Sequence, residues 1–251
     1  MKKHRGLFLA FGLLGLLGLL PQTAHAGTLT MVVSWSGGSL TITPTSPDVQ
    51  AGASSDSFNV TTTALNGDLK KAGVNLSFTN LSANTQGAGS TYFPTSGTVN
   101  ESGTVAYAAN GGTHSSVMIS TSISGFSAPT GTGIVNSTSS ALFTNANAGA
   151  TQMWSTSYQG ATETSHTFTA NGTSPQSLNS PTITNNIGAI ASGYSLDNSA
   201  TISLTKGTDV FGVSTVMSAV PEPTSIVLML TSMPLPLVVM GLIRRRRRAV
   251  A

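Results

Sequence analysis

The sequence predicts an all-β fold, an antiparallel sandwich of two sheets built from residues 27–219. Serine and threonine supply 66 of the 194 residues from 27 to 220, and β-branched threonine suits a pleated, half-exposed strand. Short segments also alternate between apolar and polar side chains with the period of a strand. Turn residues separate these segments, and no apolar pattern of helical period and useful length lies between them.

The clearest alternation occurs in two segments. Val74, Leu76 and Phe78 alternate with polar residues, and residues 117–123 keep the same period through Thr121. Further strands are expected at residues 29–35, 40–43, 58–62, 104–107, 153–158, 164–169, 201–204 and 211–216. The sequence therefore predicts about ten strands at short spacing.

Turn chemistry separates the expected strands. The pairs Asn66-Gly67, Asn110-Gly111 and Asn171-Gly172 supply the positive φ that tight hairpin turns require, and Gly37-Gly38 separates the first two strands. Residues 128–150 contain few apolar side chains and are expected to form a long loop or a weak edge region. Residues 178–193 are similarly loose.

Charge and cysteine content exclude several functions. The chain carries a net charge of +3, but most of its basic residues lie near the two ends. Residues 27–220 contain three lysines and seven carboxylates, a net charge of −4, so binding to nucleic acid is not expected. The chain has no cysteine, which excludes disulfides, thiolate metal sites and a cysteine nucleophile.

The N-terminus has the pattern of a secretory signal peptide. Lys2, Lys3 and Arg5 precede an apolar stretch from residue 7 to 20, and Ala24-His25-Ala26 places small residues where signal peptidase reads them. Residues 1–26 are therefore expected to be removed after Ala26. An uncleaved anchor is the alternative, although the apolar stretch is short for a spanning helix and ends at Pro21.

The C-terminus contains an apolar segment and an arginine cluster. Residues 225–243 are 19 residues without a charge, and as a helix they would cover ~28 Å, close to the thickness of a bilayer's hydrocarbon core. The sequence predicts one transmembrane helix here. The cluster Arg244, Arg245, Arg246, Arg247 and Arg248 should act as a stop-transfer signal and remain in the cytoplasm.

A proline-bracketed glutamate precedes the apolar segment. Pro221 and Pro223 fix their own φ and push the preceding residues toward extended geometry, so residues 220–223 should form an exposed strap around Glu222. Tripeptide, apolar segment and arginine cluster, in this order over residues 220–251, resemble the PEP-CTERM protein-sorting domain. The prolines at 234 and 236 depart from the smoother tail usual in that family and predict a kink.

The resemblance implies a partner and a processing step. In the PEP-CTERM family, an exosortase, a membrane-embedded cysteine transpeptidase, recognises the Pro-Glu-Pro tripeptide. It removes the tail and passes the protein to the cell surface. An ordinary single-pass anchor is the alternative interpretation of residues 220–251.

Neither catalytic nor metal-binding motifs are found in residues 27–219. His114 and His166 lie in Ser/Thr-rich stretches without a Gly-x-Ser-x-Gly elbow or a His-Glu-x-x-His spacing, and the carboxylates are scattered singly. We therefore expect a non-enzyme with no cofactor and no metal. A secreted hydrolase is the alternative, and it would need one of these histidines in a cleft beside a carboxylate and a hydroxyl.

Aromatic side chains offer one binding hypothesis. Only Trp35, Tyr92, Tyr107, Trp154, Tyr158 and Tyr194 could stack against the apolar face of a sugar ring. Trp154 and Tyr158 are four residues apart on one expected strand and should face the same way. They define either a carbohydrate-binding face or part of the core.

Taken together, the sequence predicts an exported bacterial surface protein. The tail would hold it in the inner membrane until an exosortase releases it to the cell surface or the extracellular matrix. The resemblance implies a structural role in an exopolysaccharide or biofilm matrix, with extracellular polysaccharide as a partner. The alternative is a membrane-tethered or secreted carbohydrate-binding module.

Overall fold

A computed structural model describes residues 27–53, 56–86, 96–126, 129, 131–191 and 193–220. The expected signal-cleavage residues Ala24 and Ala26 lie outside the described residues. So do the tripeptide 221–223, the apolar segment 225–243 and the arginine cluster 244–248. Within the described part of the chain, no helix has the length and hydropathy needed to cross a membrane.

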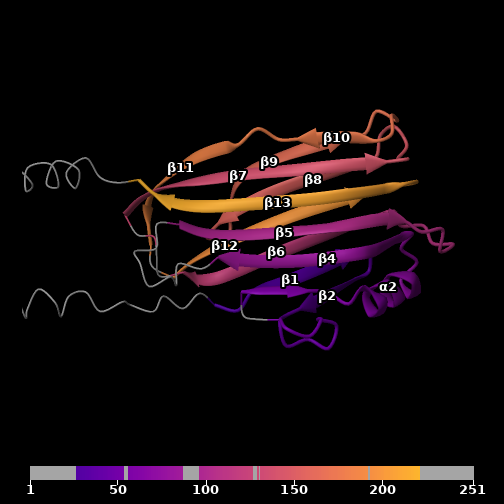
Figure 1. Ribbon diagram of the computed structural model, residues 1–251, viewed down its shortest axis with the longest axis horizontal. Helices are drawn as coiled ribbons and strands as arrows, with labels where there is room; N and C mark the ends of the chain where they lie inside the picture. The colour runs from indigo at the N-terminus through magenta and orange to yellow at the C-terminus, as the bar shows by residue number, and fades with distance from the viewer. Residues whose placement is uncertain are drawn as a thin grey trace, which may run out of the picture.

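The domain consists of two antiparallel sheets packed face to face (Figure 1). The first sheet has the strand order β2-β1-β6-β12-β8-β9. Its strands are β1 (Thr30–Trp35), β2 (Gly38–Ile42), β6 (Ser116–Phe126), β8 (Thr151–Tyr158), β9 (Ala161–Thr169) and β12 (Tyr194–Ser203).

The second sheet has the order β10-β7-β13-β5-β4-β3, and β11 also pairs with β7. Its strands are β3 (Ser57–Asn59), β4 (Leu76–Gln86), β5 (Ser96–Tyr107), β7 (Gly131–Thr144), β10 (Gln176–Asn179), β11 (Ile183–Ile190) and β13 (Thr208–Ala219). The short strands β10 and β11 follow one another along the outer side of β7 and together form that edge.

The predicted all-β antiparallel sandwich is confirmed, and each of the ten expected segments contributes to a strand. Two regions differ from the expectation. Residues 128–150 contain β7, which pairs with β13 along twelve residue positions and is therefore no loop. Residues 178–193 contain the second half of β10 and all of β11, which form the edge of the second sheet beside β7.

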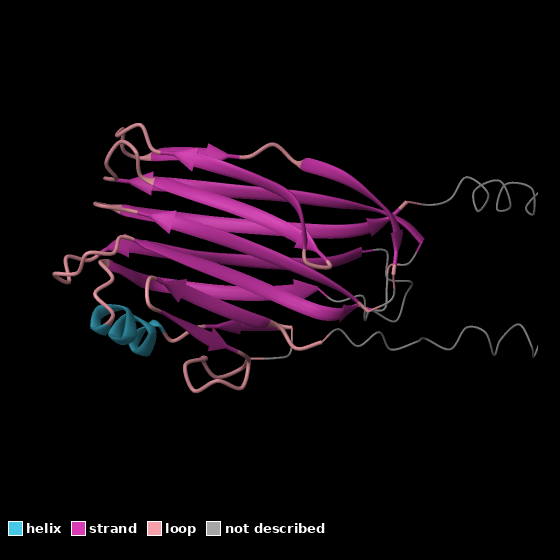
Figure 2. Ribbon diagram, turned by 180° about the vertical axis from the view of Figure 1, so that it is seen from behind, coloured by secondary structure: helices cyan, strands magenta, loops and turns pink. Residues whose placement is uncertain are grey.

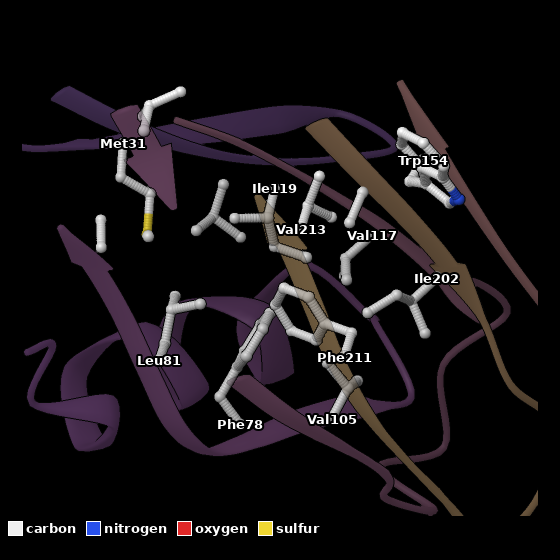
Figure 3. Close-up of a cluster of buried hydrophobic side chains, with 14 of the residues drawn as sticks. Met31, Phe78, Leu81, Val105, Val117, Ile119, Trp154, Ile202, Phe211 and Val213 are labelled. Carbon is white, nitrogen blue, oxygen red and sulfur yellow. The ribbon is translucent and has the colours of Figure 1, made fainter. Parts of the chain in front are cut away.

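Apolar side chains from the two inner faces form the core (Figure 3). Phe78, Val105 and Phe211 point inward from the second sheet and are at most 2% exposed. Val117 and Ile202 meet them from the first sheet and are equally buried. Strands β12 and β13 alternate between buried and half-buried residues along nearly their whole length, which is the pattern of a sheet with one solvated face.

Hydrogen bonds also cross between the two sheets. The Asn198 amide on β12 donates to the carbonyl oxygens of Val99 (2.9 Å) and Val213 (3.2 Å) in the opposite sheet. The Thr215 hydroxyl donates back to Asn198 Oδ1 at 2.5 Å. Because Asn198 is 1% exposed, these bonds satisfy a polar group that water cannot reach.

A second set of polar bonds joins β7 to β8. The hydroxyls of Ser137 and Thr156 lie 2.9 Å apart, and Gln152 Nε2 donates to Ser139 Oγ at 3.1 Å. All four side chains are buried. The interior of this sandwich therefore combines apolar packing with hydroxyl and amide pairs that fix the position of one sheet on the other.

The helix α2 (Thr62–Lys71) replaces the turn that was expected at Asn66-Gly67 (Figure 2). Leu65 and Leu69 are one helical turn apart and fully buried, so they attach the helix to the core. The Asn66 side chain accepts from Phe78 N (2.7 Å) and donates to Phe78 O (2.8 Å). This tertiary contact outweighs the local preference of Asn-Gly for a turn.

At the other two Asn-Gly pairs, the predicted positive φ of the glycine is confirmed, but the predicted hairpin turn is wrong. Gly111 and Gly172 have φ of 75° and 86°. However, they lie on links between β5 and β6 and between β9 and β10, which belong to different sheets, so neither closes a hairpin. A two-residue hairpin occurs at Gln159-Gly160 between β8 and β9, where both φ values are positive.

Candidate functional site

Gly27 and Val220, the first and last described residues, lie at the same end of the sandwich, here called the tail end (Figure 1). The Gly27 amide donates to Ser124 O near the end of β6, and the Val220 amide donates to Thr132 O at the start of β7 at 2.8 Å. The opposite end, here called the distal end, carries α2 (Figure 2). The first and last described residues are thus each held by one backbone hydrogen bond, to the end of β6 and to the start of β7 respectively.

Trp154 and Tyr158 do share one face of β8, as predicted, but that face is the inner one. Trp154 is fully buried (Figure 3), and its cross-strand partner on β12 is Ala200. Tyr158 is 8% exposed, and its hydroxyl accepts from the Ala191 amide at 3.3 Å. The hypothesis that these two rings form an exposed sugar-stacking face is therefore wrong.

Among the remaining aromatic candidates, Trp35 stands out. Tyr194 is 1% exposed and stacks on Phe126 with ring centroids 4.8 Å apart. Tyr107 is half-buried against the core, and Tyr92 lies outside the described residues. Trp35 is likewise half-buried and packed against the core, and it is one of the residues that line a hollow in the surface.

This hollow, here called the distal hollow, has a volume of about 370 Å³. Its floor is one cross-strand row of the first sheet, in which Met118 of β6 lies between Ser34 of β1 and Thr201 of β12. Trp35 and Ser36 at the end of β1 and residues 113–117 at the start of β6 also line it. Because β1 ends and β6 begins at this point, the hollow lies toward the distal end of the sheet.

The neighbouring strand β2 fixes the position of the Trp35 indole. A Cβ added to Gly38 would lie 3.1 to 3.2 Å from three atoms of that ring, so the indole packs directly on the Gly38 backbone. Trp35 and Gly38 are cross-strand partners next to the hairpin turn. Gly38 shares its strand parity with the buried Ile42, so the ring lies on the inner face of the sheet, opposite to the exposed Met118.

Asn75 fixes the opposite rim. Its Oδ1 accepts from the amides of Asn110 and Gly112, both at 3.0 Å, and its Nδ2 donates to Gly112 O at 2.7 Å. The His114 carbonyl accepts from the Asn75 amide at 2.7 Å, which ties the rim to the chain after α2. The link from β5 to β6 is thus held by the Asn75 side chain together with backbone hydrogen bonds to residues 73–75, and sequence patterns alone did not single out Asn75.

The two histidines do not form a catalytic or metal site with other described residues. His114 lines the distal hollow. His166 lies on edge strand β9, where its ring contacts Phe168 edge-on with centroids 5.0 Å apart. Among the described residues, no three His, Asp or Glu side chains are close enough to hold a metal ion.

Two buried carboxyl groups were not singled out by the sequence. Both side-chain oxygens of Glu101 and of Asp209 are buried and have no hydrogen-bond partner among the described residues. Burial raises the pKa of Glu101 to about 8, an effect that the nearby Thr121 of the facing sheet offsets only in part. Burial likewise raises the pKa of Asp209 to about 7. Because neither group reaches the surface, they bear on stability and do not form a binding site.

No family model matches the chain, and no curated protein matches it. Solved structures give weak similarities. Dimeric latent PorU from Porphyromonas gingivalis matches at 14% identity and a TM-score of 0.29, over 41% of this chain and 10% of PorU. A PA14 sugar-binding domain from an RTX adhesin matches at 8% identity and a TM-score of 0.24, over 41% of this chain and 48% of that one.

A protein described as "CBM4 structure and function" matches at 14% identity and a TM-score of 0.27. The match covers 52% of this chain and 82% of that protein. This chain thus spans about a tenth of the length of PorU and about half of the length of the PA14 sugar-binding domain structure. Similarities of this size assign neither a fold family nor a function to the chain.

Proposed function

We propose that this chain is an exported bacterial surface protein whose C-terminal segment, residues 220–251, directs it to an exosortase. The mature domain then serves as a structural component of an exopolysaccharide matrix. The observation that carries the first part is the position of the two ends. Gly27 follows the predicted cleavage site, β13 ends two residues before Pro221, and both ends leave the sandwich at the tail end.

This arrangement suits a domain that is tethered and then transferred. A signal peptide and a membrane tail attached at the same end can hold the domain at the membrane while both sheets and the distal end remain accessible. β13 ends at Ala219, so every strand of the described sandwich is complete before the tripeptide 221–223. Cleavage after that point would leave both sheets intact.

The surface of the second sheet supports a role in a hydrated polysaccharide matrix. Some cross-strand rows on its outer face consist of hydroxyl and amide side chains, such as the row Asn84, Asn100, Ser214 and Thr138. On neighbouring strands, Asn100 Nδ2 donates to Asn84 Oδ1 at 2.9 Å, and the Ser82 and Ser102 hydroxyls lie 2.9 Å apart. Such side chains can exchange hydrogen bonds with water and sugar hydroxyls without adding charge.

Intact mass spectrometry of surface and membrane fractions from native cells tests the sorting proposal. We expect the surface species to lack the residues beyond the Pro-Glu-Pro region. Glu222→Ala should leave export intact and block tail removal, whereas Glu163→Ala on β9 is the matched control and should be processed normally. A surface species that still carries Arg244 to Ala251 would contradict the proposal and favour a permanent anchor.

The matrix role has a separate test. The mature protein should remain with the polysaccharide fraction of washed biofilm and be released when that polysaccharide is degraded enzymatically. Release by washing alone would contradict a structural role while leaving the sorting result unaffected.

A further inference from the structure

We propose that the outer edge of strand β9 is an interface between two copies of this chain. The two β9 strands pair antiparallel across a two-fold axis, so that the first sheets of the two copies join into one sheet. The partner is a second copy of the domain, which goes beyond the proposed matrix role and does not depend on the sorting tail.

Strand β9 is the last strand of the first sheet. It pairs with β8 on one side, and no strand of the described residues pairs with its other side. Its pairing with β8 is regular from Thr164 to Thr169. The strand contains no proline, glycine or lysine, and its one carboxylate, Glu163, lies near its start. A regular strand edge of this kind is a template for pairing with another chain.

The other sheet edges in the described part of the chain are less suited to pairing. Strand β2 has five residues and ends two residues before Pro44, and β3 has only three residues. Pro181 lies between β10 and β11, and the register of β11 shifts between Asn186 and Gly188. Short strands, prolines and bulges are the features by which sheet edges avoid pairing. Residues 164–169 of β9 have none of them.

A hydrogen bond next to β9 indicates which of its backbone groups point outward. The Ala170 amide, one residue after the strand, donates to Ala150 O beside β8 at 2.8 Å. Because successive residues of a strand direct their backbone groups alternately to the two sides, every second residue back from 170 bonds toward β8. The residues between them direct N–H and C=O away from the sheet, and these are Ser165, Thr167 and Thr169.

Glu163 has the same parity, but its carbonyl already accepts a hydrogen bond from the Asn185 side chain of β11. This bond selects the register of the pair. An axis at Thr167 pairs this residue with its own copy and Ser165 with the partner's Thr169, which forms about six backbone hydrogen bonds. Glu163 then lies outside the paired segment. An axis at Ser165 would instead require the carbonyl that Asn185 occupies.

The His166 ring supports the same register. His166 and Phe168 are cross-strand partners of the buried Trp154 and Gln152, so their side chains point to the inner face of the sheet. Phe168 is buried, whereas the His166 ring, with its centroid 5.0 Å from that of Phe168, is exposed at the edge. In the proposed pair, His166 lies directly opposite the partner's Phe168. The second copy thus covers an inward-facing ring that one copy leaves exposed.

Single cysteines test the register, because the chain has no cysteine of its own. In a dimer of the full chain, purified in excess detergent, Thr167→Cys places two thiols across the axis. Paired Cα atoms are about 5.5 Å apart there, which a disulfide can bridge. We expect oxidation to convert most of this variant into a covalent dimer. Ser165→Cys is the matched control, since its two copies would lie about 14 Å apart along the strands and should stay uncoupled.

Sedimentation measures the association without cysteines. The full chain in excess detergent should form a dimer whose fraction rises with protein concentration. Thr167→Pro removes the central outward N–H, which an edge strand tolerates, and should weaken dimerisation at least tenfold. Thr41→Pro on β2, at the opposite edge of the same sheet, should dimerise like the wild type. Urea denaturation of both variants verifies that the sandwich still folds.

Three results would each overturn the proposal. Thr167→Cys could remain monomeric on oxidation, Ser165→Cys could cross-link equally well, or Thr167→Pro could dimerise as tightly as the wild type. None of these results would alter the C-terminal mass that tests the sorting function.

Discussion

Glu101→Gln should remove a pH dependence from the stability of the domain. In the folded state, burial raises the pKa of this carboxyl from 4.5 to about 8. The unfolded chain releases the proton near its ordinary pKa, so between these two values the folded state binds more protons than the unfolded state. The contribution of Glu101 to the stability of the fold is therefore fully present below pH ~4.5 and is lost as the pH rises toward ~8.

The size of the effect follows from the same shift. A rise in the pKa from 4.5 to about 8 means that ionising Glu101 costs about 5 kcal/mol more in the folded state than in the unfolded chain. Because domains of this kind are stable by only ~5 to 15 kcal/mol, the effect should be large enough to measure. Glutamine keeps the shape of the protonated acid and cannot ionise, so the variant should be several kcal/mol more stable than the wild type at pH 8 and similar to it at pH 4.5.

Urea denaturation followed by tryptophan fluorescence from pH 4.5 to 9 measures this difference. In the wild type, Asp209 should cause a similar loss of stability as the pH rises from ~4 to ~7, because burial raises its pKa to about 7. Asp209 is unchanged in Glu101→Gln, so the difference between the two curves isolates Glu101. Glu163→Gln on edge strand β9 controls for removing a carboxylate. Parallel curves for the wild type and Glu101→Gln would refute the reasoning.

Three other substitutions test how the fold is held together. Asn198→Ala leaves the buried Val99 and Val213 carbonyls without their cross-sheet donor, and it should lower the free energy of unfolding in urea by about 3 kcal/mol. Trp154→Ala should cost about 3 to 5 kcal/mol in the same assay because it empties part of the core, whereas Met153→Ala, at a position 49% exposed, should cost little. Asn75→Ala should speed amide hydrogen exchange at residues 110 and 112 without a comparable change in the strands.

The sequence predicted the sandwich because many inward positions are apolar and alternate with polar ones. The same rule failed for β7, whose inward positions include Ser137 and Ser139. These hydroxyls are buried because they bond to β8 in the facing sheet. A scan for alternating apolar residues cannot find such a strand, since its inward positions are polar and their partners lie on another strand.

The prediction missed the helix α2 for a different reason. Leu65 and Leu69, with lysines in the last turn and Gly73 beyond it, do form a short helical signal. Asn66-Gly67 indicated a turn more strongly, and only the bonds from Asn66 to the backbone of Phe78 reverse that preference. For the site, the sequence included Trp35 among the candidate rings, but it could not show that Trp154 faces inward.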